Sequence, residues 1–328
     1  MTDAADKQAS QPAADALVAE PNWLKDKIVR FRESDVFYSF KRSPVTIVAF
    51  TLVVVLVTGA LLGPLLAPQN PHNPAELNLM DGFTAPMAEN QFTGNFYLLG
   101  TDDQGRDIFS AILYGLRISL LVGFVSVLFA GVLGVTLGLI SGFFGGWIDT
   151  LIMRIADIQL TFPSILIAML IYGIARGLVP VEMRNEAAIY ILILSIGLSE
   201  WVQFARTVRG ATLVEREKEY VQAARLIGLG RFPIMLRHVL PNVMGPVLVI
   251  GTIGLALAII AEATLSFLGV GAPPTTPSLG TLIRIGQDFL FSGEWWIILF
   301  PSLTLLVLAL SVNLLGDWLR DVLNPKLR

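Results

Sequence analysis

Apolar residues in this chain are gathered into six long runs and are not spread at the spacing of a soluble core. The runs lie at about residues 45–67, 117–143, 156–176, 187–206, 243–268 and 295–316. A helix rises about 1.5 Å per residue and a bilayer's hydrocarbon core is roughly 30 Å thick, so about 20 apolar residues span it. Buried helices of a soluble enzyme would need polar faces, which these runs lack. The pattern predicts an all-α integral membrane protein with about six transmembrane helices.

Composition agrees with this pattern and excludes several kinds of site. Hydrophobic residues make up 54% of the chain and charged residues 15%, against about 25% charged in an ordinary soluble domain. The chain has no cysteine, which excludes disulfides, thiolate metal sites and cysteine nucleophiles. Its only histidines, His72 and His238, are too few and too far apart for a histidine metal cage. We therefore expect no catalytic residue, no metal site and no nucleic-acid partner.

The placement of positive charge predicts the orientation. With the amino terminus inside, 18 of the 23 lysines and arginines fall in residues 1–44, a short turn near Arg154, the loop 206–240 and the tail after 316. Because cytoplasmic loops retain positive charge, both termini are expected in the cytoplasm of a bacterial inner membrane. The first 20 residues lack the basic start and apolar core of a signal peptide, so the first span is expected to remain as an anchor. Residues 23–42 suit an interfacial helix or a solvated one.

The long inner loop is predicted to be built as helix, turn and helix. Residues 215–227 are strong helix formers, and Gly228 and Gly230 follow as terminating glycines. Pro233 suits the first turn of a second short helix, and Leu240-Pro241 is expected to break that helix where the fifth span begins. Adjacent spans need a connection of only a few residues, so a docking surface is favoured over a stiff linker.

Four motifs carry a resemblance to bacterial ABC importer permeases. The spacing of Ala223-Ala224, Gly228 and Leu240-Pro241 resembles the E-A-A-x3-G-x9-I-x-L-P loop of that family, although Gln222 stands where the family has its first Glu. Residues 99–107 (LGTDDQGRD), 265–271 (LSFLGVG) and 315–321 (LGDWLRD) resemble signatures of the dipeptide, oligopeptide and nickel subfamily. The resemblance runs from about residue 45 to 326.

The resemblance implies a type I ABC importer permease fold, with a cytoplasmic tail over residues 1–44 and a six-helix permease domain over 45–328. It implies an ATPase-docking loop at 207–240, with contacts centred on 215–238. The implied coupling residues are Glu219, Gln222, Ala223, Ala224, Gly228, Leu240 and Pro241. The outer motif residues are Gly100, Thr101, Asp102, Gly105, Arg106 and Asp107. Of these, Arg106 and Asp107 are expected to order the outer loop, to touch the binding protein or, more commonly, to form a local ion pair.

The same resemblance implies the partners: a paralogous permease, two ATPase subunits, a periplasmic binding protein and membrane lipid. The partner ATPases would bind ATP and Mg, because this chain has no GxxxxGK[ST] phosphate loop and is not itself expected to be an enzyme or to hold a cofactor. Di- and oligopeptides are the expected cargo, with nickel chelates, glutathione or opine-like compounds as alternatives.

Two features within the spans complete the expectations. Gly134, Gly138 and Gly142 recur every four residues, which lets a second helix approach the second span closely. Glu262 lies deep in the fifth span, where a carboxylate needs a polar partner or a water-filled path. It is a candidate for the translocation pathway, and a hydrogen bond between helices is the alternative. An ion-gradient-driven transporter would need more ionisable residues in its spans, and a membrane enzyme would need a visible catalytic cluster.

Overall fold

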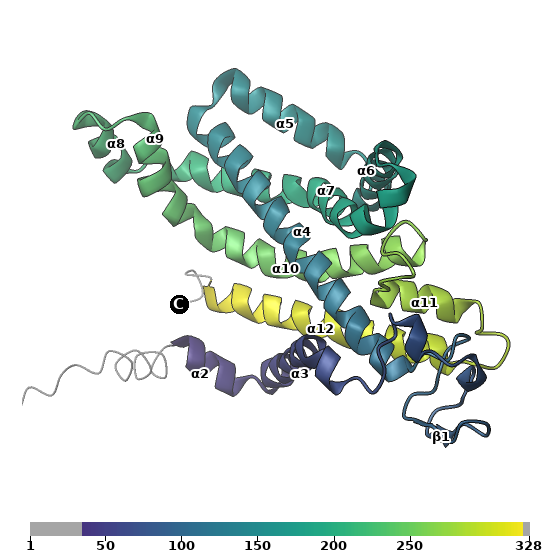
Figure 1. Cartoon of the computed structure of the whole chain (residues 1–328). Helices are drawn as coiled ribbons and strands as arrows, with labels where there is room; N and C mark the ends of the chain where they lie inside the picture. Colours follow the sequence, from purple (N-terminus) through teal and green to yellow (C-terminus); the bar gives the residue numbers. More distant parts are fainter. Residues whose placement is uncertain (1–34, 324–328) are drawn as a thin grey trace, which may run out of the picture. The chain divides into compact units, whose positions relative to one another are not determined.

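The computed structural model describes residues 35–323, which fall into two compact units divided after Ser43 (Figure 1). Of the first unit, the structure describes one helix, α2 (Asp35–Arg42), whose last turn carries Lys41 and Arg42. Most of the interfacial helix expected over residues 23–42 lies outside the described residues. The second unit holds all the other described elements.

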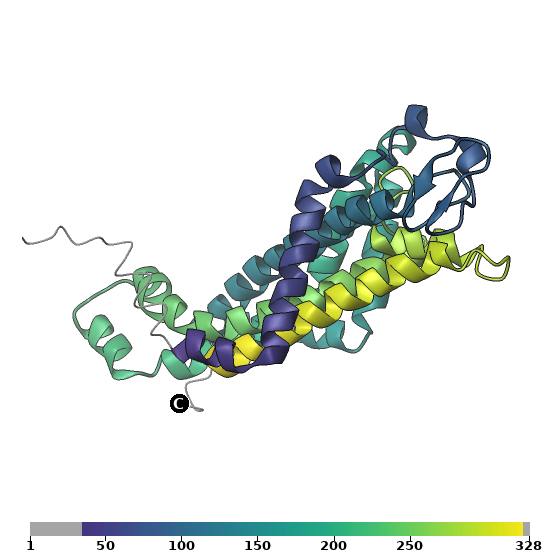
Figure 2. The same cartoon turned by 90° about the horizontal axis from the view of Figure 1, so that it is seen from below.

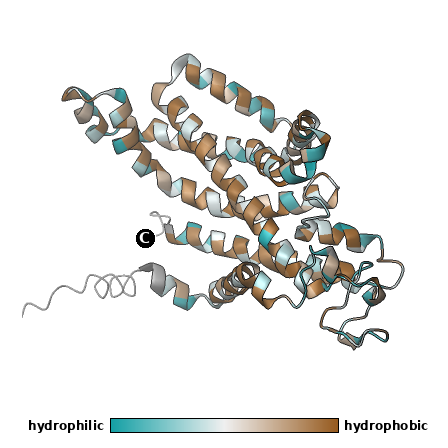
Figure 3. Ribbon diagram, in the orientation of Figure 1, coloured by the Kyte–Doolittle hydropathy of each residue, from teal (hydrophilic) through white to brown (hydrophobic). Residues whose placement is uncertain are grey.

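The second unit is built from apolar helices long enough to cross a membrane. Within the described residues these are α3 (Pro44–Leu66), α4 (Ile108–Phe144), α7 (Arg184–Glu215), α10 (Leu240–Phe267) and α12 (Trp296–Leu323). The pair α5 (Gly146–Leu160) and α6 (Ser164–Leu178) makes a sixth span if the two helices are counted together. Apolar residues dominate α3, α4, α10 and α12, whereas polar residues gather around α8 and α9 (Figure 3). The prediction of an all-α membrane protein with about six spans is confirmed.

The third span differs from the single helix expected over residues 156–176. Helices α5 and α6 are bent by 99° relative to each other. Pro163 is the N-cap of α6, and the proline ring disfavours helical geometry in the residue before it, so the chain turns there. Arg154 lies inside α5, not in a turn. The turn after α4 is instead made by Gly145 and Gly146, both with positive φ (65° and 62°).

Helices α4 and α7 form the most extensive helix pair in the second unit. A Cβ atom at Gly134 would lie 2.5 Å from the carbonyl oxygen of Trp201, and one at Gly138 would lie 2.3 Å from that of Ala205. The glycine-lined face of the second span therefore meets a helix partner, α7, within the same chain. A partner chain is not needed to cover this face.

The segment from α7 to α10 contains α8 (Glu219–Leu226), α9 (Arg231–Ile234) and a π-helical turn over Met235–Val239. The expected break at Leu240-Pro241 is absent, because the helix runs on from α9 through the π turn into α10. Pro241 has no N–H to donate to the turn before it, so one helical hydrogen bond is missing at this point. A wider π turn just before it gives the proline ring room.

Residues 67–107 form a small polar cap between α3 and α4 (Figure 2). It contains two short 3₁₀ turns, Pro74–Glu76 and Leu79–Asp81, and a two-stranded antiparallel ribbon of β1 (Ala88–Glu89) and β2 (Phe96–Tyr97). The buried carboxylate of Asp81 accepts hydrogen bonds from Tyr97 Oη (2.9 Å) and Asn95 Nδ2 (3.2 Å). Burial and this carboxylate raise the pKa of Tyr97 to about 12, so its phenol stays a donor.

A short 3₁₀ turn, Val181–Met183, connects α6 to α7. Between α10 and α12 the chain forms the nine-residue helix α11 (Leu279–Gln287). Helix α11 contacts both α10 and α12. Leu279 (α11), Ile259 (α10) and Leu308 (α12) are fully buried in one apolar cluster with residues of α4. Leu279 also joins this cluster to the polar network at Glu262, because its N–H donates to Ser119 Oγ.

Candidate functional site

Helix α8, the centre of the expected docking loop, has two distinct faces. Val221 and Ala224 are buried in an apolar cluster with the ends of α4, α7 and α10. On the opposite side and at the end of the helix, Leu226 is 88% exposed and Ile227 is 77% exposed. Gln222 and Ala223 are also exposed. The helix is therefore fixed to the membrane-spanning bundle by one face and offers uncovered apolar side chains on the other.

A glycine turn fixes the end of α8. Gly228 has φ +85°, its N–H donates to Arg225 O (3.1 Å), and the N–H of Leu229 donates to Ala224 O (3.1 Å). This is the Schellman arrangement, in which a left-handed residue satisfies the last carbonyls of a helix. Nothing lies within 4 Å of the position of a Cβ at Gly228, so conformation alone favours glycine here. Gly230 instead has φ −65° and is the N-cap of α9, so only Gly228 ends α8 as expected.

The Gln222 side chain contributes to this segment in a way that the usual glutamate does not. Its Nε2 donates a hydrogen bond to Glu217 O (2.9 Å), across the turn that precedes α8. An ionised carboxylate accepts hydrogen bonds but does not donate them. Glu219 stands in the first turn of α8, where a carboxylate favours the positive end of the helix dipole.

A tyrosine links α8 to the start of α10. The hydroxyl of Tyr220 lies 2.5 Å from Glu215 Oε1 and accepts a hydrogen bond from Asn242 Nδ2 (2.9 Å). Asn242 Nδ2 also donates to His238 O (2.7 Å). Burial, with the Glu215 carboxylate as the second cause, raises the pKa of Tyr220. Sequence reasoning missed this contact, because the partners are 22 positions apart and no local pattern joins them.

The outer motif over residues 99–107 forms the joint between the cap and α4. Gly100 has φ +81°, and a Cβ there would lie 2.7 Å from Thr84 O and 2.9 Å from the Trp296 indole. Trp296 Nε1 donates to Thr101 O (3.1 Å), and Thr101 is fully buried. At Gly105, with φ +72°, a Cβ would lie 2.1 Å from Asn78 O. Both glycines are therefore required by close backbone approach.

The charged residues of the motif are used inside the chain. Asp102 Oδ1 accepts hydrogen bonds from the backbone N–H groups of Gln104 (2.8 Å) and Arg106 (2.9 Å). Arg106 Nε lies 3.7 Å from Asp102 Oδ2. Asp107 is the N-cap of α4 and accepts from Ser110 N (2.9 Å). All three charged side chains are nearly buried, and burial raises the pKa of Asp102. Among the roles expected for Arg106 and Asp107, these contacts favour local pairing that orders the cap.

Glu262 is fully buried five residues before the end of α10. Its carboxylate accepts hydrogen bonds from Ser119 Oγ of α4 (2.7 Å) and from Ser266 Oγ of α10 (2.7 Å). Ser119 Oγ in turn accepts from Leu279 N at the start of α11 (3.2 Å), and Ser266 Oγ accepts from Ala272 N (3.0 Å). The network joins α4, α10, α11 and the loop between α10 and α11. Of the two roles left open by the sequence, these contacts support the bond between helices.

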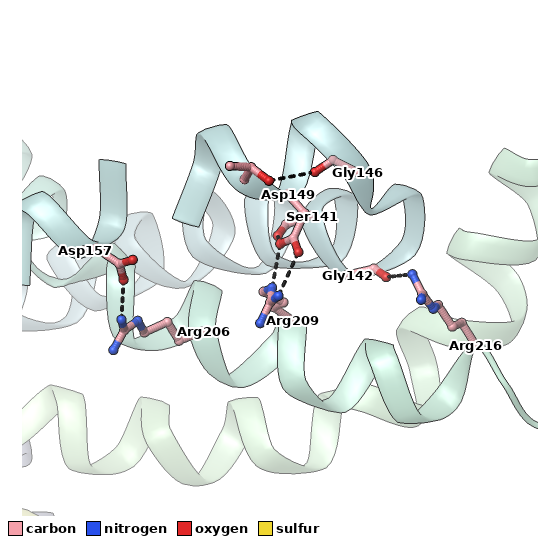
Figure 4. A network of polar contacts seen from close by, with 9 residues as sticks. Ser141, Gly142, Gly146, Asp149, Asp157, Arg206, Arg209 and Arg216 are labelled. Carbon is pink, nitrogen blue, oxygen red and sulfur yellow. Dashed lines mark hydrogen bonds and ion pairs between the residues drawn. The ribbon is translucent and has the colours of Figure 1, made fainter. Parts of the chain in front are cut away.

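Three arginines at the end of α7 bind the end of α4 and two points along α5 (Figure 4). Arg209 Nε and Nη2 lie 2.5 Å and 2.7 Å from the two carboxylate oxygens of Asp149, in bidentate geometry. Arg206 pairs with Asp157, and Arg216 Nη1 donates to Gly142 O (2.7 Å). Spacings of three and seven residues place the three arginines on one helix face. From the sequence alone these arginines were used only for the orientation, although their spacing on one helix face was visible there.

Among the described residues, no group of three or more His, Asp or Glu side chains could hold a metal ion. A groove of about 580 Å³ lies between α4, α7 and α10 and is lined mainly by apolar side chains, among them Phe124, Leu128 and Met244. Its polar lining groups are Thr136 and Thr252.

The chain matches two family models. Residues 134–328 match the binding-protein-dependent transport system inner membrane component, and residues 34–86 match the N-terminal TM domain of oligopeptide transport permease C. A chain in an inward-facing structure of the MetNI methionine ABC transporter aligns with 65% of this chain, and 96% of itself, at 20% identity and a TM-score of 0.49.

Curated relatives align over nearly the whole length. The dipeptide transport system permease protein DppC of Haemophilus influenzae is 36% identical over 89% of this chain and 94% of its own. The DppC of Alkalihalophilus pseudofirmus is 39% identical over 90% of both chains. The glutathione transport system permease protein GsiD of Pectobacterium atrosepticum is 34% identical over 95% of this chain and 97% of its own. From the family models and these relatives, the chain belongs to the binding-protein-dependent transport system inner membrane components, the permease subunits of ABC importers.

Proposed function

We propose that this permease subunit carries di- or oligopeptides into the cell, together with a paralogous permease. The support comes from the relatives, two of which are named for dipeptides and one for glutathione, itself a tripeptide. Nickel chelates and opine-like compounds are the alternative cargoes. Uptake of labelled dipeptides should fall in cells that lack this chain and return with the gene. Unchanged dipeptide uptake together with lost nickel uptake would contradict the peptide assignment.

The proposed coupling site is the segment 215–238, with Glu219, Gln222, Ala223, Ala224, Gly228, Leu240 and Pro241 as its residues. The observation that carries this proposal is the two-faced α8, which buries Val221 and leaves Leu226 and Ile227 exposed to solvent. Uncovered apolar side chains on a rigid polar segment mark a protein interaction site. An ATPase subunit, docking here, would move the ends of α7 and α10 together, because both pack against the buried face of α8.

Cysteine crosslinking tests this contact, and the natural absence of cysteine gives a clean background. Ala223→Cys places a thiol on the exposed face of α8 without changing the buried one. We expect it to crosslink to an ATPase subunit in the assembled complex. Thr150→Cys, exposed on α5, is the matched control and should not crosslink. No crosslink from Ala223→Cys in a complex that retains both ATPases would refute the proposed docking site.

The proposed assembly has one copy of this chain, one paralogous permease and two ATPase subunits that bind ATP and Mg. A periplasmic binding protein would dock on the outer side, where the cap exposes the apolar side chains of Leu79, Met87 and Phe92. Both termini would lie in the cytoplasm, because the basic segments then stay inside. In intact cells, an impermeant thiol reagent should label Gln91→Cys in the cap and leave Ala223→Cys unlabelled. The reverse pattern would overturn the orientation.

Glu262 is proposed to serve the translocation pathway by holding its outer end in place. Its carboxylate is fully buried and accepts hydrogen bonds from Ser119 and Ser266. It is therefore not accessible to cargo. The groove between α4, α7 and α10 is the proposed face for the paralogous permease or the pathway between the two chains. A purified complex that transports without any ATPase would instead favour an ion-gradient-driven transporter.

A further inference from the structure

A charged pocket of about 480 Å³ opens between the end of α4 and the docking segment itself, which supplies most of its lining. Its walls come from the end of α4, the residues just after α7, α8, the turn that leads into α9, and α9 itself. One water takes about 30 Å³ of liquid, so the space equals roughly 16 waters. This is more room than a packing defect between helices leaves.

Three arginines line this pocket, Arg216, Arg225 and Arg231, against a single acidic residue, Glu217. The Glu217 carboxylate is already used, because Arg216 Nε lies 3.0 Å from its Oε1. Among residues 35–323, Arg225 and Arg231 form no ion pair with a carboxylate. The pocket therefore carries two guanidinium groups whose charge is not neutralised by the described part of the chain.

Two of the three arginines, Arg216 and Arg225, are held in place by contacts within the chain. Arg216 Nη1 donates to Gly142 O (2.7 Å), which fixes that guanidinium against the end of α4. The Arg225 guanidinium lies over the ring of Phe143, 5.9 Å from its centroid. Phe143 and Ile234 are nearly buried and form an apolar floor. A fixed set of donors loses less conformational freedom on binding than a mobile one.

The surroundings place the pocket at the level of the bilayer surface. Phe144 is the last residue of α4, a helix apolar enough to span a membrane, so the span reaches the interface there. Trp147, three residues on, is 74% exposed, and exposed tryptophans concentrate at membrane–water interfaces. Phe232 is 64% exposed and its ring packs against that of Phe144, with centroids 5.9 Å apart. Apolar surface thus adjoins the charged pocket.

We propose that this pocket binds the phosphate of an anionic phospholipid headgroup, with the acyl chains along Phe144 and Phe232. Guanidinium groups pair with phosphate oxygens in bidentate geometry, and basic pockets on the cytoplasmic side of membrane proteins suit anionic headgroups. The lipid proposal rests on the proposed function in one respect: the orientation proposed above puts the pocket on the cytoplasmic side of the membrane. Carboxylates of an ATPase subunit are the competing occupant. The apolar floor and the interfacial aromatic residues favour lipid, since an ATPase carboxylate needs neither.

Lipid titration of the purified four-subunit complex, followed by native mass spectrometry, tests the proposal. Phosphatidylglycerol and phosphatidylcholine are the two probes, and Arg225→Gln combined with Arg231→Gln is the pocket variant. Each basic residue near a membrane surface contributes about a fivefold preference for anionic lipid, so the variant should bind phosphatidylglycerol about 25-fold more weakly. Its weak binding of phosphatidylcholine should not change.

The matched control removes equal charge outside the pocket. Arg154→Gln with Arg237→Gln changes two exposed arginines that do not line it, and phosphatidylglycerol affinity should fall by much less than in the pocket variant, because exposed charges are screened by salt. Equal loss in both variants would reduce the effect to net charge and overturn the site. A pocket variant that keeps its lipid affinity but loses its ATPase subunits would assign the arginines to the ATPase. Inorganic phosphate, titrated in place of lipid, would overturn the lipid assignment if it alone bound in an arginine-dependent way.

The proposed docking and the lipid site fail in distinguishable ways. Loss of the lipid effect leaves the Ala223→Cys crosslink to the ATPase unchanged, because Ala223 does not line the pocket. Failure of that crosslink, with a 25-fold lipid effect retained, would instead remove the docking site and keep the lipid site.

Discussion

The bidentate pair between Arg209 and Asp149 is expected to fasten α7 to α5 more strongly than its neighbour, the pair between Arg206 and Asp157. Both pairs join the same two helices and differ mainly in exposure. The Arg209 and Asp149 side chains are 33% and 18% exposed, whereas those of Arg206 and Asp157 are 50% and 48% exposed. Asp149 has a further donor in Ser141, and Arg209 meets it with two nitrogens. The two acidic residues therefore form a matched comparison.

The magnitudes follow from burial. Removing one partner of a fully buried pair costs 3–5 kcal/mol, and hydrogen bonds to charged groups contribute about 1.5–3 kcal/mol. Because Arg209 is still one-third exposed, we expect Asp149→Asn to lower the free energy of unfolding by about 2 kcal/mol, below the buried limit. Asp157→Asn should lower it by less than about 1 kcal/mol, as for exposed ion pairs.

A double-mutant cycle separates the pair from other effects of each substitution. Unfolding of the purified complex in mixed detergent would be followed for Asp149→Asn, Arg209→Gln and the double variant. Residues in direct contact show coupling energies of about 0.5–3 kcal/mol, and we expect a value in the upper half of that range. Coupling below about 0.5 kcal/mol, or equal effects of Asp149→Asn and Asp157→Asn, would refute the argument from burial.

Three further substitutions test other parts of the structure. Gly228→Val should introduce roughly 1–3 kcal/mol of backbone strain at a left-handed position and uncouple ATP hydrolysis from transport. The control Gly230→Ala, at a residue with φ −65°, should leave coupling intact. Normal transport per ATP hydrolysed in Gly228→Val would contradict this. Glu262→Gln should assemble normally, because an amide keeps hydrogen bonds to the two serines. Glu262→Leu leaves the serine hydroxyls unpaired and should lower the free energy of unfolding in detergent by about 1–3 kcal/mol. A fully stable Glu262→Leu would show that the network adds nothing to stability. Gly138→Leu should prevent close packing of α4 on α7 and lower the amount of complex in membranes. The control Gly131→Ala, whose Cβ would make ordinary contacts at 3.7 Å, should be tolerated. Equal amounts of complex for the two variants would argue against the glycine contact.

Features that depend on local sequence could be predicted, and features that depend on distant partners could not. Runs of apolar residues announced the spans, because bilayer thickness sets their length independently of how they pack. The turn at Gly228 was equally visible, since only the conformation of one residue decides it. The bend between α5 and α6 was not predicted from the sequence, although it occurs at Pro163. The residues on both sides of this proline are apolar, and such a run is compatible with one straight helix or with two helices.

The contacts that fix the proposed site join residues far apart in sequence. Ser119 and Glu262 are 143 positions apart, and Arg209 and Asp149 are 60 positions apart. Glu262 could be recognised as unusual, because a carboxylate in a span needs a donor, but nothing local identifies that donor. Asp149 lies between the predicted spans and gave no such indication. Serine was the harder partner to foresee, since a helix accepts serine in many environments and Ser119 shows no charge. A single sequence thus identifies which buried polar groups need a partner, and the fold determines which residue is that partner.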